Sequence, residues 1–311
     1  MDRVRARTAA ALLVIAFAAA AAGCFASRRT LLKVGSEVEG KKVTLDERIF
    51  SDGIRLVGLW KAERYYKALG VPVLQVVEHD PDRLPVLLVH GYNDNAKAMR
   101  YLGGLLDPDK FEPVYANYPT GLAIDKLAEG LAASVSKLAG EKKLDRMGVV
   151  AFSMGGLVAR KFLGAWAGAG KETKMPIYIS MAAPYGGIEV GSKLKSWRLY
   201  EPESWNDIAF GSAFLDHLYD EALPPETAFH LIYAVTEGKA AVPGVDDGVV
   251  SVASATRPQA VDEADTVSEI RACHHATLLE KKEPIMKVIE FLLAYDKAWR
   301  KSGTAPPPAA P

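Results

Sequence analysis

From about residue 71 the chain alternates short runs rich in apolar and β-branched residues with longer segments of helical periodicity. The short runs predict strands at 71–77, 84–89, 113–118, 147–152, 176–182 and 229–235. The longer segments predict helices at 96–106, 124–138, 154–166 and 285–298. Strands that alternate with helices form βα units around a mainly parallel sheet. The sequence therefore predicts an α/β fold, with helices flanking a mainly parallel central sheet.

Composition narrows the class of partner. The chain carries 38 Lys and Arg against 38 Asp and Glu, so no overall positive charge indicates a nucleic-acid partner. Hydrophobic residues make up 49% of the 311 residues, which excludes a disordered or fibrous chain. The charge balance therefore predicts no nucleic-acid partner.

The first residues have the layout of an export signal. A basic stretch at 1–7 precedes an uncharged run from Thr8 to Gly23. At about 16 residues, this run is short for the roughly 30 Å hydrocarbon core of a bilayer, which favours a signal peptide at 1–23 over a transmembrane helix. The end, Ala21-Ala22-Gly23-Cys24, resembles the lipobox of bacterial lipoproteins. That resemblance implies lipid attachment at Cys24 and a protein anchored in the bacterial envelope, on its periplasmic or outer-membrane face; the alternative is an ordinary secretory signal.

The rest of the chain divides into a body and its connections. Residues 24–43 are expected to form a linker after the lipid anchor, and residues 44–300 the α/β domain, with an N-terminal helix within 44–70. The stretch 184–225 is too long for an ordinary connection, which predicts a lid or cap that carries Trp197 and Trp205. Residues 301–311 lack apolar periodicity and are expected to form a disordered tail.

One strand leads into a helix without a loop. Residues 149–152 form an apolar strand that ends at Ser153, and helical periodicity starts at Met154. This is the arrangement of a nucleophile elbow, a sharp turn that exposes a serine and requires small residues two positions to either side. Ala151 and Gly155 occupy those positions. Ser153 is therefore the candidate nucleophile.

A second loop supplies the expected oxyanion hole. The apolar strand 84–89 ends at His90-Gly91-Tyr92-Asn93. Acyl transfer requires two backbone N–H groups aimed at the developing oxyanion, one after the nucleophile and one from such a loop. Met154 and Tyr92 occupy these positions, and His90 is expected to shape the loop rather than to transfer protons.

The acid and the base both occur as doublets. In this order of elements an acid and then a histidine follow the serine. The chain offers Asp246-Asp247 in a glycine-flanked turn and His274-His275 before the final helix. Successive residues in extended backbone point to opposite sides, so one member of each doublet can face Ser153.

These motifs together resemble the α/β-hydrolases of the bacterial lipase and esterase type, over roughly residues 84–295. The match of Asp-Gly-Val-Val to their acid turn selects Asp247, and the match of His-x-x-Leu-Leu to their histidine turn selects His275. The loop 182–187 is similar to their small-residue loop after the sixth strand. The resemblance implies a serine hydrolase that cleaves acyl esters through a Ser153-His275-Asp247 triad and an acyl-enzyme, without cofactor or metal.

Other functions remain open at this point. An acyltransferase or thioesterase could use the same triad, and an envelope lipoprotein could use the fold only to bind. Cys273 could be a nucleophile, although its neighbour His274 would point away from it, and zinc at His274, His275 and Asp247 lacks a recognisable ligand spacing. Asp80, Asp82, Asp107 and Asp109 are expected to be solvated turn residues, with calcium binding as the alternative.

Overall fold

The computed structural model describes residues 26–38, 41–188, 201–236 and 246–302. The predicted signal peptide, Cys24 and most of the predicted tail lie outside these residues, as do positions 189–200 of the predicted lid, which include Trp197. No helix in the described part of the chain combines the length and the apolar character that crossing a bilayer requires.

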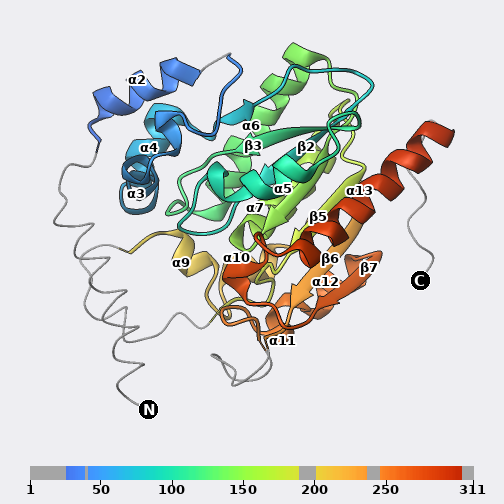
Figure 1. Ribbon diagram of the computed structural model, residues 1–311. Coiled ribbons are helices and arrows are strands. Elements are labelled where there is room, and N and C mark those ends of the chain that lie inside the picture. Colours follow the sequence, from blue (N-terminus) through green and yellow to red (C-terminus); the bar gives the residue numbers. More distant parts are fainter. Residues whose placement is uncertain (1–25, 39–40, 189–200, 237–245, 303–311) are drawn as a thin grey trace.

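A seven-stranded sheet forms the centre of the described residues, as Figure 1 shows. Its order is β1-β3-β2-β4-β5-β6-β7, and every neighbouring pair is parallel except β1 and β3. The strands are β1 (Val73–Gln75), β2 (Leu84–Val89), β3 (Phe111–Ala116), β4 (Gly148–Phe152), β5 (Ile177–Met181), β6 (Ala228–Ala234) and β7 (Thr266–Ile270). The predicted α/β fold with a mainly parallel sheet is confirmed.

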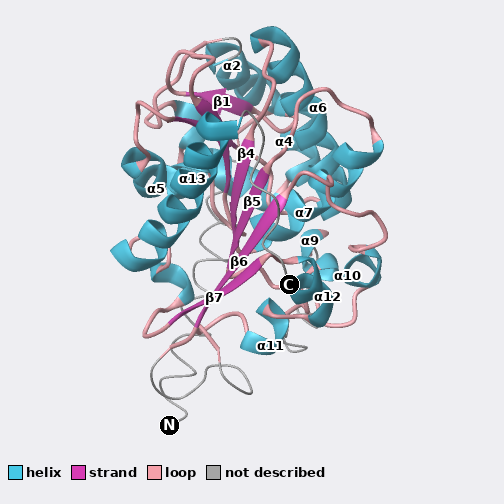
Figure 2. Ribbon diagram, turned by 90° about the vertical axis from the view of Figure 1, so that its right-hand side faces the viewer, coloured by secondary structure: helices cyan, strands magenta, loops and turns pink. Residues whose placement is uncertain are grey.

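Helices cover both faces of this sheet (Figure 2). One layer contains η2 (Ala96–Met99), α5 (Arg100–Leu105) and α13 (Lys282–Ser302), and the other contains α6 (Ile124–Lys142), α7 (Met154–Gly168) and α12 (Pro258–Glu263). Side chains alternate between the two layers, so Val86 and Leu88 of β2 join one core and Leu87 and Val89 the other. All six residues of β2 are buried, which explains its continuous apolar run.

The N-terminal region differs from its prediction. Residues 28–38, expected to belong to a linker, form α2 (Arg28–Val38) and bury Leu31, Val34 and Val38. The helix packs on α4 (Ala62–Leu69). The sequence of α2 alone does not show that α4 covers this side of it. The single helix expected within 44–70 is instead η1 (Arg48–Phe50), α3 (Asp52–Trp60) and α4, with a break at Lys61.

Strand β7 is not predicted from the sequence. This strand runs at the edge of the sheet beside β6 alone, and most of its side chains are partly or fully exposed. An edge strand with one partner needs no apolar run, and Thr-Val-Ser-Glu-Ile shows none. Its position matters because the histidine turn follows it.

The described part of the predicted cap consists of short helices that contact the body. These are α9 (Ser204–Asp207) and α10 (Ala213–His217). The N–H of Ile124 donates to Asp207 Oδ2 at 2.7 Å, and the N–H of Glu203 donates to the carbonyl of Gly121 at 2.8 Å. Through these bonds α9 lies against the loop that leads into α6. The short helix α11 (Val252–Ala255) follows the acid turn, and η3 (His275–Thr277) begins at the second histidine of the doublet.

Candidate active site

Ser153 occupies a strained turn between β4 and α7. Its backbone has φ 54° and ψ −130°, a conformation that costs a side-chain-bearing residue about 1–3 kcal/mol. The Ser153 N–H donates to the carbonyl of Met181 on β5 at 2.8 Å, and the Ser153 carbonyl accepts from Gly156 at 2.8 Å. These bonds hold the turn in place and leave the hydroxyl at the end of the sheet.

Close contact between backbones explains the small residues around the serine. A Cβ atom at Gly155 would lie 2.3 Å from the carbonyl oxygen of His90, and one at Gly156 would lie 2.4 Å from the Cβ of Ala183. A Cβ at Gly91 would come within 3.1 Å of the Cβ of Ser153. The elbow and the loop after β2 therefore lie against each other, as the expected oxyanion hole requires.

The structure brings Ser153, His275 and Asp247 together. His275 Nε2 is 2.8 Å from Ser153 Oγ, and His275 Nδ1 is 2.7 Å from Asp247 Oδ2. All three side chains are buried, with the Asp247 carboxylate 1% exposed. The ring of Phe152 packs against the His275 ring, with centroids 4.9 Å apart. Ser153 follows β4, Asp247 follows β6 and His275 follows β7. Along the chain, Ser153 and His275 are 122 positions apart, and Asp247 and His275 are 28 positions apart.

The acid turn fixes the orientation of Asp247. Its Oδ1 accepts the N–H groups of Val249 at 3.0 Å and Val250 at 2.8 Å, which leaves Oδ2 for the histidine. Asp246 is buried too, and its Oδ1 accepts the N–H of Gly248 at 2.9 Å. The carboxylates of the doublet therefore differ in their partners.

The histidine doublet divides in the same way. The N–H of His275 donates to the carbonyl of Asp247 at 2.7 Å, so backbone and side chain both bind the acid turn. His274 is exposed. The structure thus places His275 in the buried row with the serine and leaves the imidazole of His274 in solvent.

The loop after β2 carries Tyr92 and is built around a buried histidine. The His90 ring stacks on Tyr118 at 4.1 Å, and the Tyr118 hydroxyl donates to the His90 carbonyl. Burial lowers the pKa of His90 to about 4, so the ring is neutral at pH 7. Its Nδ1–H donates to the Gly91 carbonyl at 2.9 Å, while Nε2 accepts the N–H of Tyr118 at 3.4 Å. His90 therefore shapes the loop, as predicted.

The candidate oxyanion donors lie on the two backbones that meet at the serine. Met154 is the first residue of α7, and the first N–H groups of a helix have no partner within it. Tyr92 lies two residues after His90, whose carbonyl oxygen lies against Gly155. The indole N–H of Trp205 donates to the Tyr92 hydroxyl, so the predicted cap reaches the side chain of an expected oxyanion residue. No local pattern in the sequence indicates the contact of Trp205 with Tyr92.

The alternative sites gain no support from the geometry. Cys273 is buried, its pKa is raised by that burial, and its Sγ lies 3.8 Å from both the His274 carbonyl and Thr277 Oγ1. Among the residues that the structure describes, no group of three or more His, Cys, Asp or Glu side chains is arranged to hold a metal ion.

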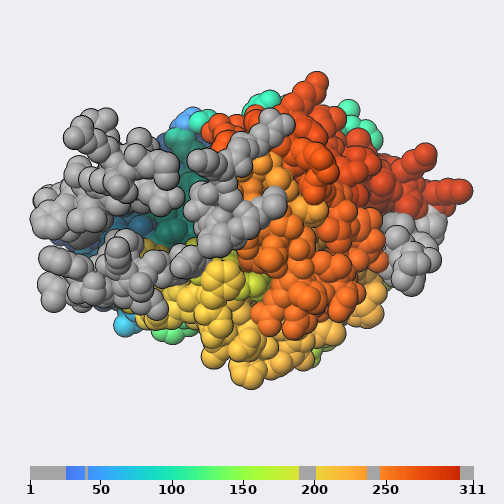
Figure 3. Space-filling model, turned by 90° about the horizontal axis from the view of Figure 1, so that it is seen from below, coloured from blue at the N-terminus to red at the C-terminus, as the bar shows by residue number. Residues whose placement is uncertain are grey.

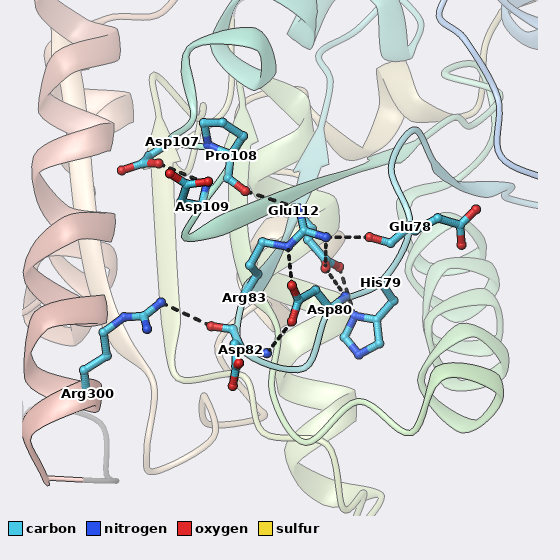
Figure 4. Close-up of polar contacts among 10 residues, drawn as sticks. All are labelled: Glu78, His79, Asp80, Asp82, Arg83, Asp107, Pro108, Asp109, Glu112 and Arg300. Carbon is cyan, nitrogen blue, oxygen red and sulfur yellow. Dashed lines mark hydrogen bonds and ion pairs between the residues drawn. The ribbon is translucent and has the colours of Figure 1, made fainter.

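The aspartates considered for calcium belong to two turns that precede β2 and β3 (Figure 4). Asp80 Oδ1 accepts the N–H of Asp82 at 3.0 Å, and Asp107 Oδ1 accepts that of Asp109 at 3.0 Å. Such bonds are ordinary turn structure, as expected from the sequence. The turns lie at the start of their strands, whereas Ser153 follows the end of β4.

Comparisons with known proteins find one matching family model and several similar folds. Residues 78–210 match the family described as "Putative serine esterase (DUF676)". No curated protein matches the chain. The fold resembles the mature lipase BlEst2 of Bacillus licheniformis, with TM-score 0.54, 15% identity, and coverage of 71% of this chain and 97% of that one. It also resembles a gene product of Listeria innocua, with TM-score 0.52, 18% identity, and coverage of 68% and 94%.

A third similar structure is lipase B of Aspergillus fumigatus, with TM-score 0.53, 16% identity, and coverage of 74% of this chain and 57% of that one. At these identities the shared feature is the fold alone. The shared architecture is the α/β-hydrolase fold, and residues 78–210 within it match the serine esterase family model.

Proposed function

We propose that this protein is a serine hydrolase that cleaves carboxylic esters through an acyl-enzyme, with Ser153, His275 and Asp247 as its triad. The observation that carries the proposal is the buried row of contacts, 2.8 Å from Ser153 Oγ to His275 Nε2 and 2.7 Å from His275 Nδ1 to Asp247 Oδ2. A serine hydroxyl is unreactive at pH 7 until a base takes its proton. The row supplies that base and the acid that orients it.

Each side chain then has a defined role. Ser153 Oγ attacks the ester carbonyl while His275 Nε2 takes the hydroxyl proton, and the N–H groups of Tyr92 and Met154 bind the oxyanion. His275 returns the proton to the leaving alcohol, and a water molecule repeats the sequence to release the acid. Asp247 holds the Nδ1–H tautomer and stabilises the imidazolium.

The proposed acyl group is apolar. A pocket of about 440 Å³ lies between the loop after β5, the described cap and α11, and Ser251, just after the acid turn, lines it. Phe210, Leu215 and Ala253 contribute apolar surface to this pocket, which Asp216 and Arg257 also line, and Phe210 is 58% exposed. In Figure 3 the yellow cap residues and the orange residues after the acid turn lie next to each other on this face.

Ester chain length tests this substrate class. Each methylene transferred from water to an apolar site contributes about 0.8 kcal/mol, so kcat/KM should rise about threefold to fourfold per methylene over the first carbons. Phe210→Ala should flatten that increase, and Val261→Ala, a half-exposed apolar residue on α12, should leave it unchanged. An identical chain-length profile in wild type and Phe210→Ala would rule out this pocket as the acyl site.

Covalent labelling tests the reaction itself. A fluorophosphonate should label the wild-type protein and not Ser153→Ala, and the wild type should hydrolyse a simple aryl ester. A panel that adds thioesters and acyl acceptors separates a hydrolase from a thioesterase or acyltransferase. A folded protein that neither labels nor turns over any ester would contradict the proposal and indicate a binding protein.

We also propose that the protein is exported and anchored in the bacterial envelope through lipid on Cys24. The basic, apolar and cysteine segments occur in the order that lipoprotein signals require. The packed helix α2 starts four positions after Cys24, so the anchor would hold the catalytic body near the membrane. Globomycin should block processing, and Cys24→Ser should release the protein from membranes. Unchanged processing and fractionation of Cys24→Ser would show that no lipid is attached there.

A further inference from the structure

The N-terminal helices, which lie outside the residues matched to the esterase family, contact the loop that carries Tyr92. Arg55 of α3 makes the most direct contact. Its Nη1 donates to the carbonyl of Asn93 at 2.9 Å and to Asn93 Oδ1 at 2.5 Å. The side chain is 20% exposed, and its Nε donates to Asp52 Oδ1 at 3.1 Å. A cationic group thus binds the residue directly after the expected oxyanion donor.

The loop needs such support because its backbone is strained. Asn93 has φ 54°, in the left-handed region that side-chain-bearing residues rarely adopt. The N–H of Asn93 donates to Thr120 Oγ1 at 3.2 Å, and Asn95 Nδ2 donates to the carbonyl of Phe50 at 3.0 Å. Two of these three supports come from residues 50–55. The N-terminal segment that contains η1 and α3 therefore helps to hold the loop in its strained conformation.

The helix that carries Arg55 is itself firmly placed. The N–H of Gly121 donates to the Gly58 carbonyl at 3.0 Å, and a Cβ at Gly121 would lie 2.0 Å from the carbonyl oxygen of Leu59. The backbone of α3 thus contacts the loop after β3 directly. A side chain on so rigid a base can hold a partner to the tolerance that oxyanion binding requires.

Arg55 also acts on the charge beside the loop. Burial raises the pKa of Asp94, whereas the N–H of Asn95 and the positive charge of Arg55 lower it. The guanidinium therefore favours the ionised form of Asp94 and offsets its charge in a partly buried setting, where screening by water is weak.

We propose that Arg55 is a positioning residue for the oxyanion hole: its two hydrogen bonds to Asn93 hold the loop so that the Tyr92 N–H points at the oxyanion. This inference rests on the proposed ester hydrolysis. Because the oxyanion exists only after attack on the carbonyl, a displaced donor lowers kcat and leaves substrate binding unchanged.

The test compares Arg55→Ala, Arg55→Lys and Asn93→Gly with wild type on one aryl ester. Loss of one oxyanion donor lowers kcat about 10²- to 10³-fold, and a displaced donor should lower it less, about 10- to 100-fold for Arg55→Ala, with KM within about twofold. A trifluoromethyl ketone, which forms the oxyanion with Ser153, should bind more weakly by the factor lost in kcat/KM. Arg55→Lys should recover part of kcat, because it keeps a cationic donor.

Asn93→Gly gives an independent measurement from the other side of the contact. Glycine tolerates φ 54° and removes the side-chain acceptor while Arg55 stays in place, so the loop loses one bond without added strain. It should lower kcat in the same way, and combining it with Arg55→Ala should cost less than the product of the single effects, because both changes break one contact. This variant keeps the test valid if Arg55→Ala does not fold.

The matched control is Arg48→Ala. Arg48 belongs to η1, its side chain is 59% exposed, and its Nη1 lies 3.8 Å from Glu37 Oε1. Its kcat should equal that of wild type. Unchanged kcat in folded Arg55→Ala or Asn93→Gly, or a loss confined to KM, would overturn the role of Arg55. Absence of esterase activity in the wild type would instead overturn the proposed function, so the two failures are distinguishable.

Discussion

Asp247→Asn replaces a single atom of the buried acid. Asp247 Oδ1 accepts the N–H groups of Val249 and Val250, so the amide oxygen of asparagine will keep that position. The NH₂ group then occupies the place of Oδ2, 2.7 Å from His275 Nδ1. Two donors cannot share this contact, so Nδ1 must become the acceptor and the ring proton moves to Nε2. A protonated Nε2 faces Ser153 Oγ and cannot take its proton.

The expected loss is about 10⁴-fold in kcat, or roughly 5.5 kcal/mol of barrier, which is the scale for a triad histidine held in the wrong tautomer. Asp246→Asn is the matched control, because it makes the same change in a neighbouring buried carboxylate whose Oδ1 accepts the N–H of Gly248. It should keep most of the activity. His275→Ala removes the base and should cost more, about 10⁶-fold, whereas His274→Ala changes an exposed side chain and should cost little.

The assay is steady-state hydrolysis of an aryl ester at saturation, with the melting temperature measured for each variant. Asparagine keeps the shape and the backbone acceptor of the acid, so Asp247→Asn should melt close to wild type. Equal losses of kcat for Asp246→Asn and Asp247→Asn, at normal melting temperatures, would refute the assignment within the acid doublet. The same comparison between the two histidines decides the base.

Two further predictions concern stability. Gly155→Ala should lower the free energy of unfolding in urea by at least about 1–3 kcal/mol, because the added Cβ would lie 2.3 Å from a carbonyl oxygen. A Cβ added at Gly104 meets no atom within 4 Å, so Gly104→Ala should stabilise α5 slightly. Equal effects of the two changes would contradict the close contact at the elbow. Burial lowers the pKa of His90 and of His230 to about 4 in the folded protein. Below about pH 6.5 the unfolded chain therefore binds more protons than the folded protein. The free energy of unfolding should fall by roughly 1 kcal/mol for each histidine between about pH 6.5 and 5.5. A urea midpoint that does not change over this interval would show that both rings titrate normally.

Local patterns in the sequence were enough to predict most of the sheet and the position of its elbow. Strands buried on both faces, such as β2 and β4, must be apolar throughout, so they are visible in the sequence. A serine directly between strand and helix with small flanking residues is likewise a local feature, and Ser153 adopts the strained backbone that it predicts. The resemblance of two turns to known motifs selected one member of each doublet.

Other features depend on residues distant in the sequence, and only the tertiary structure reveals them. The edge strand β7 has a single partner strand, so half-exposed polar residues suffice there, and α2 buries three residues against a helix that its own sequence does not specify. The contact of Arg55 with Asn93 joins residues 38 positions apart, and that of Trp205 with Tyr92 joins residues 113 apart. Periodicity reports how one segment divides between core and solvent; it holds no information on which polar side chains meet across loops, because that follows from how the completed elements pack.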